Sequence, residues 1–305
     1  MTEHDFAVYN AFSDSPFGGC VAGIVDQASE LNASEMLQIA QEVDAPATCF
    51  ITAISQENIE VRFFSPLTEY PMCGHAAVAL TTWLAERNLL AFDESDVVRI
   101  RLSTPHAFAE IEARKRKAGR VEVLLTLPPA KFSSVSVDDL ELASVLGLDR
   151  GQLSNDLERV MTITDFRSLL VPMRNRRDLE AVVPDFDTIH SFCMRTHLDT
   201  VFLFAPTGDH WLDGIRCREF CPAVGSLESA ASGTTNRSVS CYLYQHAQLT
   251  SVPDGSLSLS IFQGNEIGRP SNIKSVISFR DGNVNKVDIG GLATRVVNGT
   301  FFTPF

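Results

Sequence analysis

The sequence lacks the features that mark membrane, secreted and metal-binding proteins. No apolar run in its 305 residues approaches the roughly 20 residues that a transmembrane helix needs. The N-terminus, MTEHDFAVYN, does not have the basic-then-apolar layout of a signal peptide. The seven cysteines are odd in number and form no CxxC pair, so they indicate neither a disulfide framework nor a zinc site. We therefore expect a cytoplasmic protein without a metal, in which most cysteines are reduced and buried.

Basic residues are also scarce. There are 25 Lys and Arg residues against 38 Asp and Glu residues, which gives a formal net charge of −13. A surface of this sign does not attract a phosphate backbone or anionic lipid. The densest basic run, RKRK at residues 114–117, is most simply a solvated turn. We expect neither a nucleic-acid partner nor a membrane partner.

The composition is that of a globular enzyme-sized chain, with 45% hydrophobic and 21% charged residues. Its length predicts two domains, with a boundary between residues 117 and 118; an alternative returns the final strands to the N-terminal domain. Predicted strands lie at residues 5–12, 21–25, 48–54, 59–64, 97–102, 107–112, 121–127, 168–173, 200–206, 214–220, 256–262, 274–279 and 292–302. The first predicted helix begins at Asn32 or Ser34. Further predicted helices span residues 74–86, 137–147 and 234–246, and residues 179–192 form a mixed segment.

Two glycine-led helix starts carry the residues of chemical interest. The first is Cys73-Gly74-His75 and the second is Ser232-Gly233, followed by Thr234. The first N–H groups of a helix have no intrahelical partner, and the macrodipole adds positive charge, so such an end favours a bound carboxylate. The same field favours a thiolate at Cys73, and glycine lets a ligand approach the backbone closely.

The two halves of the chain contain an internal echo. The segment RFFSP at residues 62–66 corresponds to REFCP at residues 218–222, and Cys73-Gly74 corresponds to Ser232-Gly233 at nearly the same separation. Because the recurrence lies just upstream of both glycine-led helices, duplication is the better interpretation. We expect two related lobes that face each other, with the site between them.

At these residues the chain resembles the phenazine-biosynthesis isomerase (PhzF-like) family, within the larger group that shares the diaminopimelate epimerase fold. The resemblance covers nearly the whole chain, and the segment QGNEIGRPSNI at residues 263–273 is a fairly specific match to that family. It implies an α+β fold of two pseudo-symmetric lobes, each a curved mixed sheet around a central helix. It also implies acid/base chemistry without a cofactor, and it makes a homodimer a plausible assembly.

The departures from the family pattern are informative. Ala47 stands where the family has an acid/base glutamate, Ser229 replaces its aspartate, and Thr234 replaces the serine after the second glycine, whereas His75 is kept. These changes argue against the usual glutamate-driven proton shift.

Cys73 offers a replacement for the glutamate. The string MCGH resembles the first half of the motif of proline racemase and diaminopimelate epimerase, in which cysteine thiolates move an α-proton. Ser232 stands where those enzymes have a second cysteine. A neutral serine is a poor acid and base near neutral pH, so the pattern favours one-base chemistry at Cys73.

The predicted site has catalytic and binding members. The predicted catalytic residues are Cys73, His75 and Ser232, and the predicted substrate-binding residues are Gly74, Gly233, Thr234, Ser229, Thr48 and Glu228. Most of them also have a purely structural interpretation. Cys73 could be a packing residue, and His75 could bond a backbone carbonyl. Ser232 and Thr234 could be helix caps. Glu69 and Glu228 could orient loops, but Glu228 is also the acid/base reserve, being the carboxylate nearest to Ser232 in sequence.

We therefore expect a cofactor-independent isomerase or epimerase that acts by proton transfer on a small carboxylated metabolite, in secondary metabolism. A lyase or dehydratase that uses Cys73 as a single base is the second hypothesis. A catalytically silent descendant that binds a metabolite is the third, suggested by the absent glutamate and aspartate.

Overall fold

The computed structural model describes residues 2–163, 166–246, 249 and 255–304. The chain forms two compact units, Met1–Thr126 together with Gly290–Phe305, and Leu127–Ile289. The boundary expected from the sequence, between residues 117 and 118, falls between two neighbouring strands of the first unit. In the part of the chain that is described, no helix is long and apolar enough to cross a membrane.

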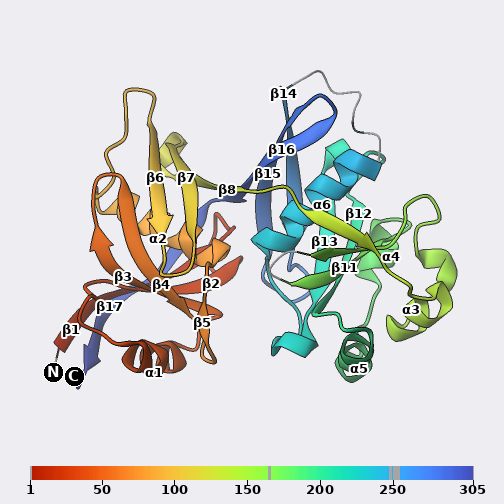
Figure 1. Cartoon of the computed structure of the whole chain (residues 1–305), viewed down its shortest axis with the longest axis horizontal. Helices are drawn as coiled ribbons and strands as arrows, with labels where there is room; N and C mark the ends of the chain where they lie inside the picture. Colours follow the sequence, from red (N-terminus) through yellow and green to blue (C-terminus); the bar gives the residue numbers. More distant parts are fainter. Residues whose placement is uncertain (1, 164–165, 247–248, 250–254, 305) are drawn as a thin grey trace. The chain divides into compact units, whose positions relative to one another are not determined.

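The first unit is a mixed sheet around one buried helix (Figure 1). Its elements are β1 (Thr2–Ala11), β2 (Cys20–Val25), α1 (Ala33–Val43), β3 (Ala47–Ile54), β4 (Asn58–Phe64), β5 (Glu69–Tyr70), α2 (Gly74–Glu86), β6 (Val97–Ser103), β7 (Phe108–Lys115), β8 (Val121–Leu127) and β17 (Ala293–Thr303). β2 and β3 run parallel, as do β4 and β6, while β17, β1 and β2 pair antiparallel in succession.

Helix α2 is the centre of the first unit. Its residues from Ala76 to Leu84 are all buried, and it packs against β1, β2, β3 and β17. A helix that is apolar on every side must be surrounded by the rest of its domain. Helix α1 lies on the outside and begins at the predicted cap, where Asn32 and Glu35 form a capping box.

The second unit repeats this plan. Its elements are β9 (Lys131–Ser134), α3 (Asp139–Val145), β10 (Val160–Ile163), β11 (Arg167–Pro172), α4 (Arg176–Glu180), α5 (Phe186–Thr196), β12 (Thr200–Pro206), β13 (Ile215–Phe220), α6 (Gly233–His246), β14 (Gly255–Gln263), β15 (Ser271–Arg280) and β16 (Asn283–Gly291). β11 and β12 are parallel, β12 and β13 antiparallel, and β13 and β14 parallel. Helix α6 is buried from Thr235 to Tyr244, so both glycine-led helices are central and the expected α+β fold class is confirmed.

The mixed segment predicted at residues 179–192 resolves into two helices. Helix α4 ends at Glu180 and α5 begins at Phe186, after the Asp185 side chain caps it. Pro184 lies between them, where a helix cannot easily continue. The short strands β5, β9 and β10 were not predicted, because two to four residues carry too little periodicity to be recognised.

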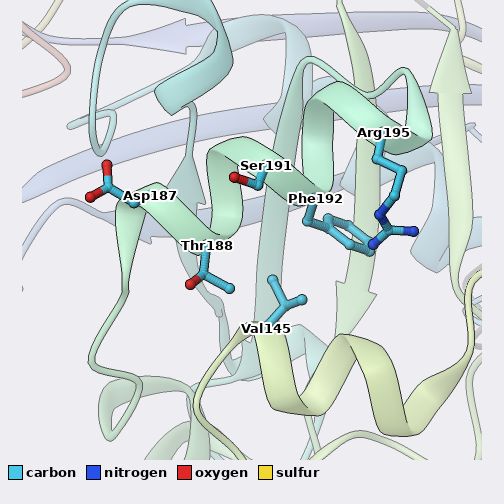
Figure 2. Close-up of a pocket in the computed structure, with 6 residues that line it drawn as sticks. All are labelled: Val145, Asp187, Thr188, Ser191, Phe192 and Arg195. Atoms are coloured by element: carbon cyan, nitrogen blue, oxygen red, sulfur yellow. The ribbon is translucent and has the colours of Figure 1, made fainter.

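An open pocket of about 330 Å³ lies on the outside of the second unit, between α3 and α5. Figure 2 shows that five of its six labelled side chains come from α5 and one, Val145, from α3. Phe192 at this pocket belongs to the hydrophobic core of the unit. None of the predicted site residues lines the pocket, so it is a feature of the helix packing and not the expected site.

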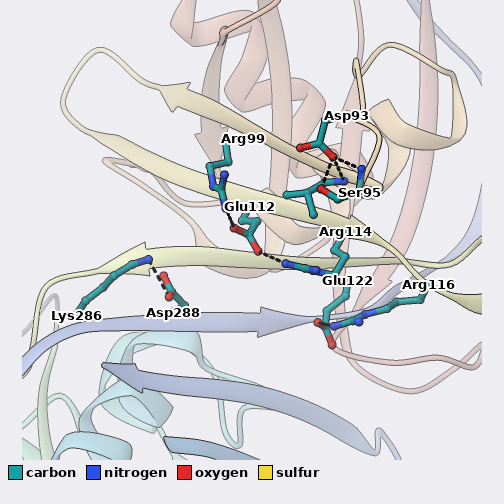
Figure 3. A network of polar contacts seen from close by, with 10 residues as sticks. Asp93, Ser95, Arg99, Glu112, Arg114, Arg116, Glu122, Lys286 and Asp288 are labelled. Atoms are coloured by element: carbon teal, nitrogen blue, oxygen red, sulfur yellow. Dashed lines mark hydrogen bonds and ion pairs between the residues drawn. The ribbon is translucent and has the colours of Figure 1, made fainter. Parts of the chain in front are cut away.

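The densest basic run lies at the end of β7 and is balanced by acidic neighbours. Arg114 lies 3.2 Å from Glu112, which also contacts Arg99 at 2.7 Å. Arg116 pairs with Glu122, and Figure 3 shows these pairs along the strands. Exposed pairs of this kind contribute little to stability. They do cancel local charge, so the run does not form a basic patch.

Candidate active site

Cys73 lies immediately before α2 and in contact with His75. Its backbone is extended, with φ −139° and ψ 108°, and its carbonyl oxygen accepts the N–H of Ala77 at 2.9 Å. Its Sγ lies 3.3 Å from Nδ1 of His75. The helix start therefore brings two of the predicted catalytic side chains together.

Burial sets the protonation state of this pair. It raises the pKa of the Cys73 thiol to about 12, and hydrogen bonds from the backbone at Ala76 and His75 offset only part of the rise. It also lowers the pKa of His75 to about 4, although a hydrogen bond to the Val21 backbone favours the charged ring. The expected thiolate is therefore wrong for the free protein: desolvation outweighs the helix N-terminus, and a neutral thiol faces a neutral imidazole.

A neutral thiol–imidazole pair is still able to move protons. The ring nitrogen can take the thiol proton when a bound group favours the ion pair, and it can return that proton afterwards. No other base is needed for this exchange, because donor and acceptor are already in contact. The arrangement is compatible with the one-base chemistry that the sequence predicts.

The two glycines of the helix starts leave room beside the backbone. A Cβ built on Gly74 would meet no atom within 4 Å, and one built on Gly233 would meet only Cγ2 of Ile289, at 4.0 Å. Gly264 is the contrast, since its Cβ would lie 2.4 Å from the carbonyl oxygen of Arg269. Close approach of a ligand to the first N–H groups of α2 and α6 is therefore sterically possible.

Ser232 caps α6 and also joins a cluster of hydroxyls. Its Oγ accepts the N–H of Thr235 at 3.4 Å, as the structural alternative expects. The same Oγ lies 3.0 Å from Oγ1 of Thr235 and 3.3 Å from Oγ1 of Thr234. Its carbonyl oxygen accepts both the backbone N–H and the side-chain amide of Asn236, at 3.1 and 2.7 Å. Ser232, Gly233 and Thr234 thus lie together at one helix start.

Each of the duplicated RxF segments holds an arginine–glutamate pair. Arg62 donates to both oxygens of Glu69, at 2.7 and 2.6 Å. Arg218 donates to both oxygens of Glu228, at 2.9 Å each. Two parallel hydrogen bonds fix a carboxylate firmly. Glu228 is therefore held in the loop before α6 by Arg218, which fits the loop-orienting alternative and leaves it poorly placed as an acid/base reserve.

The side chains of Thr48 and Ser229 have contacts of their own. A Cβ on Gly23 would lie 3.0 Å from both Oγ1 of Thr48 and Cγ1 of Val43, so Thr48 points toward α1. Successive residues of a strand face opposite sides, and Cys49, whose pKa burial raises with a smaller contribution from Cys73, faces the other way. The expectation that Thr48 binds substrate stays a prediction. The Ser229 hydroxyl donates within its own loop, to a carbonyl oxygen two residues on, at 3.2 Å.

Glu219 is the functional candidate that the sequence analysis missed. It lies in β13 with only 3% of its surface exposed, and the Thr235 hydroxyl donates to its Oε1 at 2.7 Å. The polar side chains of Thr200, Ser232 and Gln263 lie close to its carboxyl; burial raises the pKa of Glu219, and these polar groups lower it in part. A buried carboxyl beside a predicted catalytic hydroxyl is typical of acid/base sites. The only signal in the sequence was a lone acid in the apolar strand IRCREF.

Comparison with known proteins assigns the family. A model of the PhzC-PhzF family, described as phenazine biosynthesis-like protein, matches residues 9–299. The chain belongs to the PhzC-PhzF family. The resemblance predicted from the sequence is thereby confirmed.

Relatives of this PhzC-PhzF chain match over nearly their whole length. An uncharacterized isomerase of Deinococcus radiodurans is 28% identical, covering 94% of this chain and 91% of that protein. The trans-2,3-dihydro-3-hydroxyanthranilate isomerase of Pseudomonas chlororaphis is 25% identical, covering 97% and 99%. The crystal structure of a Bacillus anthracis PhzF-family protein superposes with a TM-score of 0.87 at 24% identity, covering 99% and 100%. The PhzC-PhzF chain is thus an isomerase of this family.

Proposed function

We propose that this isomerase shifts a proton within a small carboxylated metabolite, without a cofactor, and that Cys73 and His75 form the proton-transfer pair. The observation that carries the proposal is the 3.3 Å contact between Sγ and Nδ1 at the start of α2. Ala47 stands where the family resemblance places a glutamate. The thiol–imidazole pair is therefore the replacement for that carboxylate in the first unit.

The proposed reaction balances as a one-base isomerisation. The substrate carboxylate binds the first N–H groups of α2, where Gly74 leaves room for it. His75 takes the thiol proton, and Sγ then takes a proton from a substrate carbon. The electron pair of the broken C–H bond forms a new double bond and the old double bond shifts. Sγ then returns the proton at the far carbon, and His75 gives its proton back to Sγ. The product has the mass of the substrate.

Ser232, Gly233 and Thr234 are proposed to bind or polarise the same substrate. Their support is the hydroxyl cluster at the start of α6. That Cys73 and Ser232 serve one substrate stays a prediction. A double-mutant cycle with Cys73→Ala and Ser232→Ala tests it, because groups that act on one reacting molecule are strongly non-additive.

The first test uses trans-2,3-dihydro-3-hydroxyanthranilate, the compound named for the Pseudomonas chlororaphis relative, in heavy water. An isomerase gives a product of unchanged mass apart from exchanged hydrogen, whereas a dehydratase gives a product that has lost water. We expect Cys73→Ala to lower kcat at least about 10²-fold with an unchanged thermal midpoint.

Cys193→Ala, which removes a buried thiol from the core of the second unit, is the matched control and should keep its turnover number. Full turnover by Cys73→Ala would refute the assignment, and a wild-type protein that binds the compound without hydrogen exchange would favour a silent binder.

A further inference from the structure

The two central helices differ in one respect that packing does not require. After its glycine, α2 continues with small apolar residues, whereas α6 continues with buried polar ones. The buried polar residues of α6 are Thr235, Asn236, Arg237, Ser238 and Ser240. In the internal echo, the first-unit counterpart of Glu219 is Phe63, which is fully buried. The second unit thus places a carboxyl where the first has an aromatic ring.

The carboxyl of Glu219 is linked to Ser232 through one intermediate hydroxyl. Oγ of Ser232 lies 3.0 Å from Oγ1 of Thr235, and Oγ1 of Thr235 lies 2.7 Å from Oε1 of Glu219. Thr235 and Glu219 are 1% and 3% exposed, whereas Ser232 is partly exposed. A continuous hydrogen-bonded path therefore leads from a partly exposed hydroxyl to a carboxyl in the interior.

The Thr235 hydroxyl donates to Glu219, and the other polar groups close to its carboxyl are the hydroxyls of Thr200 and Ser232 and the amide of Gln263. Burying a carboxyl in such surroundings is costly for its charged form. The two arginines of β13 form ion pairs with other carboxylates, Arg218 with Glu228 and Arg216 with Glu266.

Two further titratable groups interact with Glu219, the thiols of Cys217 on the same strand and Cys221 just after it. Burial raises the pKa of both, and the Glu219 charge raises each further. The two thiols are therefore neutral and place no charge beside Glu219. The carboxyl is poised to hold a proton to higher pH than an exposed glutamate does.

We propose that Glu219 is the proton reservoir of Ser232: its carboxyl gives up and takes back a proton through the Thr235 hydroxyl, so that Ser232 acts as an acid and a base toward the substrate. The inference rests on the proposed function, in which Ser232 contacts the substrate. It answers the objection that a serine alone is a poor acid and base near neutral pH. Glu219 acts through Ser232 and is a positioning residue.

In the relay, Ser232 replaces Sγ of Cys73 as the proton donor at the far carbon, and protons are conserved at every atom. The proton kept by the Cys73–His75 pair and the one lost by Glu219 are exchanged with water between turnovers. When Ser232 Oγ gives its proton to a substrate carbon, the Thr235 hydroxyl gives its proton to Ser232 Oγ. The carboxylic proton of Glu219 passes to Oγ1 of Thr235. The substrate gains one proton, the carboxyl loses one, and both hydroxyls are restored. The reverse order removes a proton from the substrate.

The first experiment needs no substrate. The full-length protein with ¹³C-labelled glutamate is titrated by NMR, and Glu219→Gln assigns the signal by removing it. We expect the carboxyl to titrate well above an exposed glutamate. Ser232→Ala and Thr235→Val should each move its titration further upward, because each removes a donor that favours the carboxylate. Ser240→Ala, which removes a hydroxyl that donates to the Asn236 carbonyl of the same helix, is the control and should leave it unchanged. A carboxyl that titrates like an exposed glutamate, or ignores both variants, overturns the relay.

The second experiment measures turnover of trans-2,3-dihydro-3-hydroxyanthranilate against pH. Glutamine at position 219 keeps the shape and accepts the Thr235 hydrogen bond, but it cannot carry the proton. We expect Glu219→Gln and Thr235→Val to lower kcat about 10²-fold with little change in KM, to lose one limb of the pH profile, and to add nothing to Ser232→Ala. A wild-type kcat in Glu219→Gln overturns the relay. Inactivity of the wild type on this compound counts against the proposed function alone, and the titration then decides the relay.

Discussion

At the scale of single residues, burial decides what Cys73 and His75 can do. The sequence predicted the residue types and the helix start that presents them, and the 3.3 Å contact fits that prediction. It could not predict their protonation, because the groups around the pair come from distant segments, such as the β2 backbone at Val21 and the thiol of Cys49 in β3. Position on a helix can be read from a local pattern, but solvent exclusion depends on the whole fold.

Gly74 is expected to matter for substrate binding, whereas Gly264 is expected to matter for stability. Gly74→Ala should leave stability unchanged or raise it by about 0.5–1 kcal/mol, because the added Cβ has open space and alanine favours a helix. It should weaken substrate binding by blocking approach to the backbone. Gly264→Ala should destabilise by roughly 1–3 kcal/mol, since its φ is +79° and its Cβ would lie 2.7 Å from the Ala230 carbonyl oxygen. Urea denaturation of both variants, with turnover of Gly74→Ala, checks this; an unstable Gly74→Ala would contradict it.

The stability of the protein should depend on His75 in mildly acidic solution. Its pKa is about 4 in the folded state and 6.5 in the unfolded state. The neutral ring therefore contributes stability fully above pH 6.5, and that contribution is lost as the pH falls through 4. We expect the difference in unfolding free energy between wild type and His75→Gln to shrink over this interval. Urea denaturation at a series of pH values measures it, and a difference independent of pH would contradict the shift.

At the scale of elements, most of the correct predictions followed from the internal echo between the two halves of the sequence. The repeated RxF segments proved to be β4 and β13, helix α2 has the predicted bounds, and α6 begins one residue earlier than predicted. The echo did not predict that each arginine binds a glutamate from the segment before the central helix. Those pairs depend on how the loops close, which periodicity does not describe.

The Glu219 carboxyl was not predicted, for a related reason. Its partners come from β12, the start of α6 and the end of β14. Pairing of β13 with β12 on one side and β14 on the other brings them together. The sequence shows a strand with one acid, and only the pairing order shows that both edges of this strand are covered.

The two arginine–glutamate pairs should differ sharply in their contribution to stability. The side chains of Arg62 and Glu69 are 22% and 21% exposed, whereas those of Arg218 and Glu228 are 4% and 3% exposed. Removing Glu228 leaves a buried guanidinium unpaired, so Glu228→Ala should cost about 3–5 kcal/mol. Glu69→Ala, the matched variant, should cost about 1 kcal/mol or less. Chemical denaturation compares them, and equal losses would show that burial does not distinguish the pairs.

At the scale of the whole molecule, the first unit is built from both ends of the described chain. Strand β1 pairs with β17 from Thr2–Thr303 to Ala11–Ala293 and with β2 on its other side, and Figure 1 shows the two ends next to each other. The sequence left the placement of the last strand open. A strand pattern indicates which face is buried, but it does not name the neighbouring strand.

A circular permutant should therefore fold. Joining Thr303 to Thr2 by a short linker, with new ends at the exposed turn of residues 281–282, should preserve the thermal midpoint within a few degrees, since paired residues of antiparallel strands lie only about 5 Å apart. Truncation after Gly291 is the comparison, and it should unfold the first unit because β1 loses its longest partner. Near-UV circular dichroism and thermal melting measure both. A permutant as unstable as the truncation would mean that the ends are not neighbours.

The pairing of β1 with β17 also fixes an order of events during synthesis. The ribosome releases Thr2–Ala11 first and Ala293–Thr303 only after Leu127–Ile289 has emerged. Domains fold as units while the nascent polypeptide lengthens, so the later unit can finish before the earlier one. Throughout translation of that unit, one edge of β1 is uncovered, and an uncovered strand edge is a template for unwanted association. The nascent chain is therefore most prone to unwanted association at β1 until β17 is made.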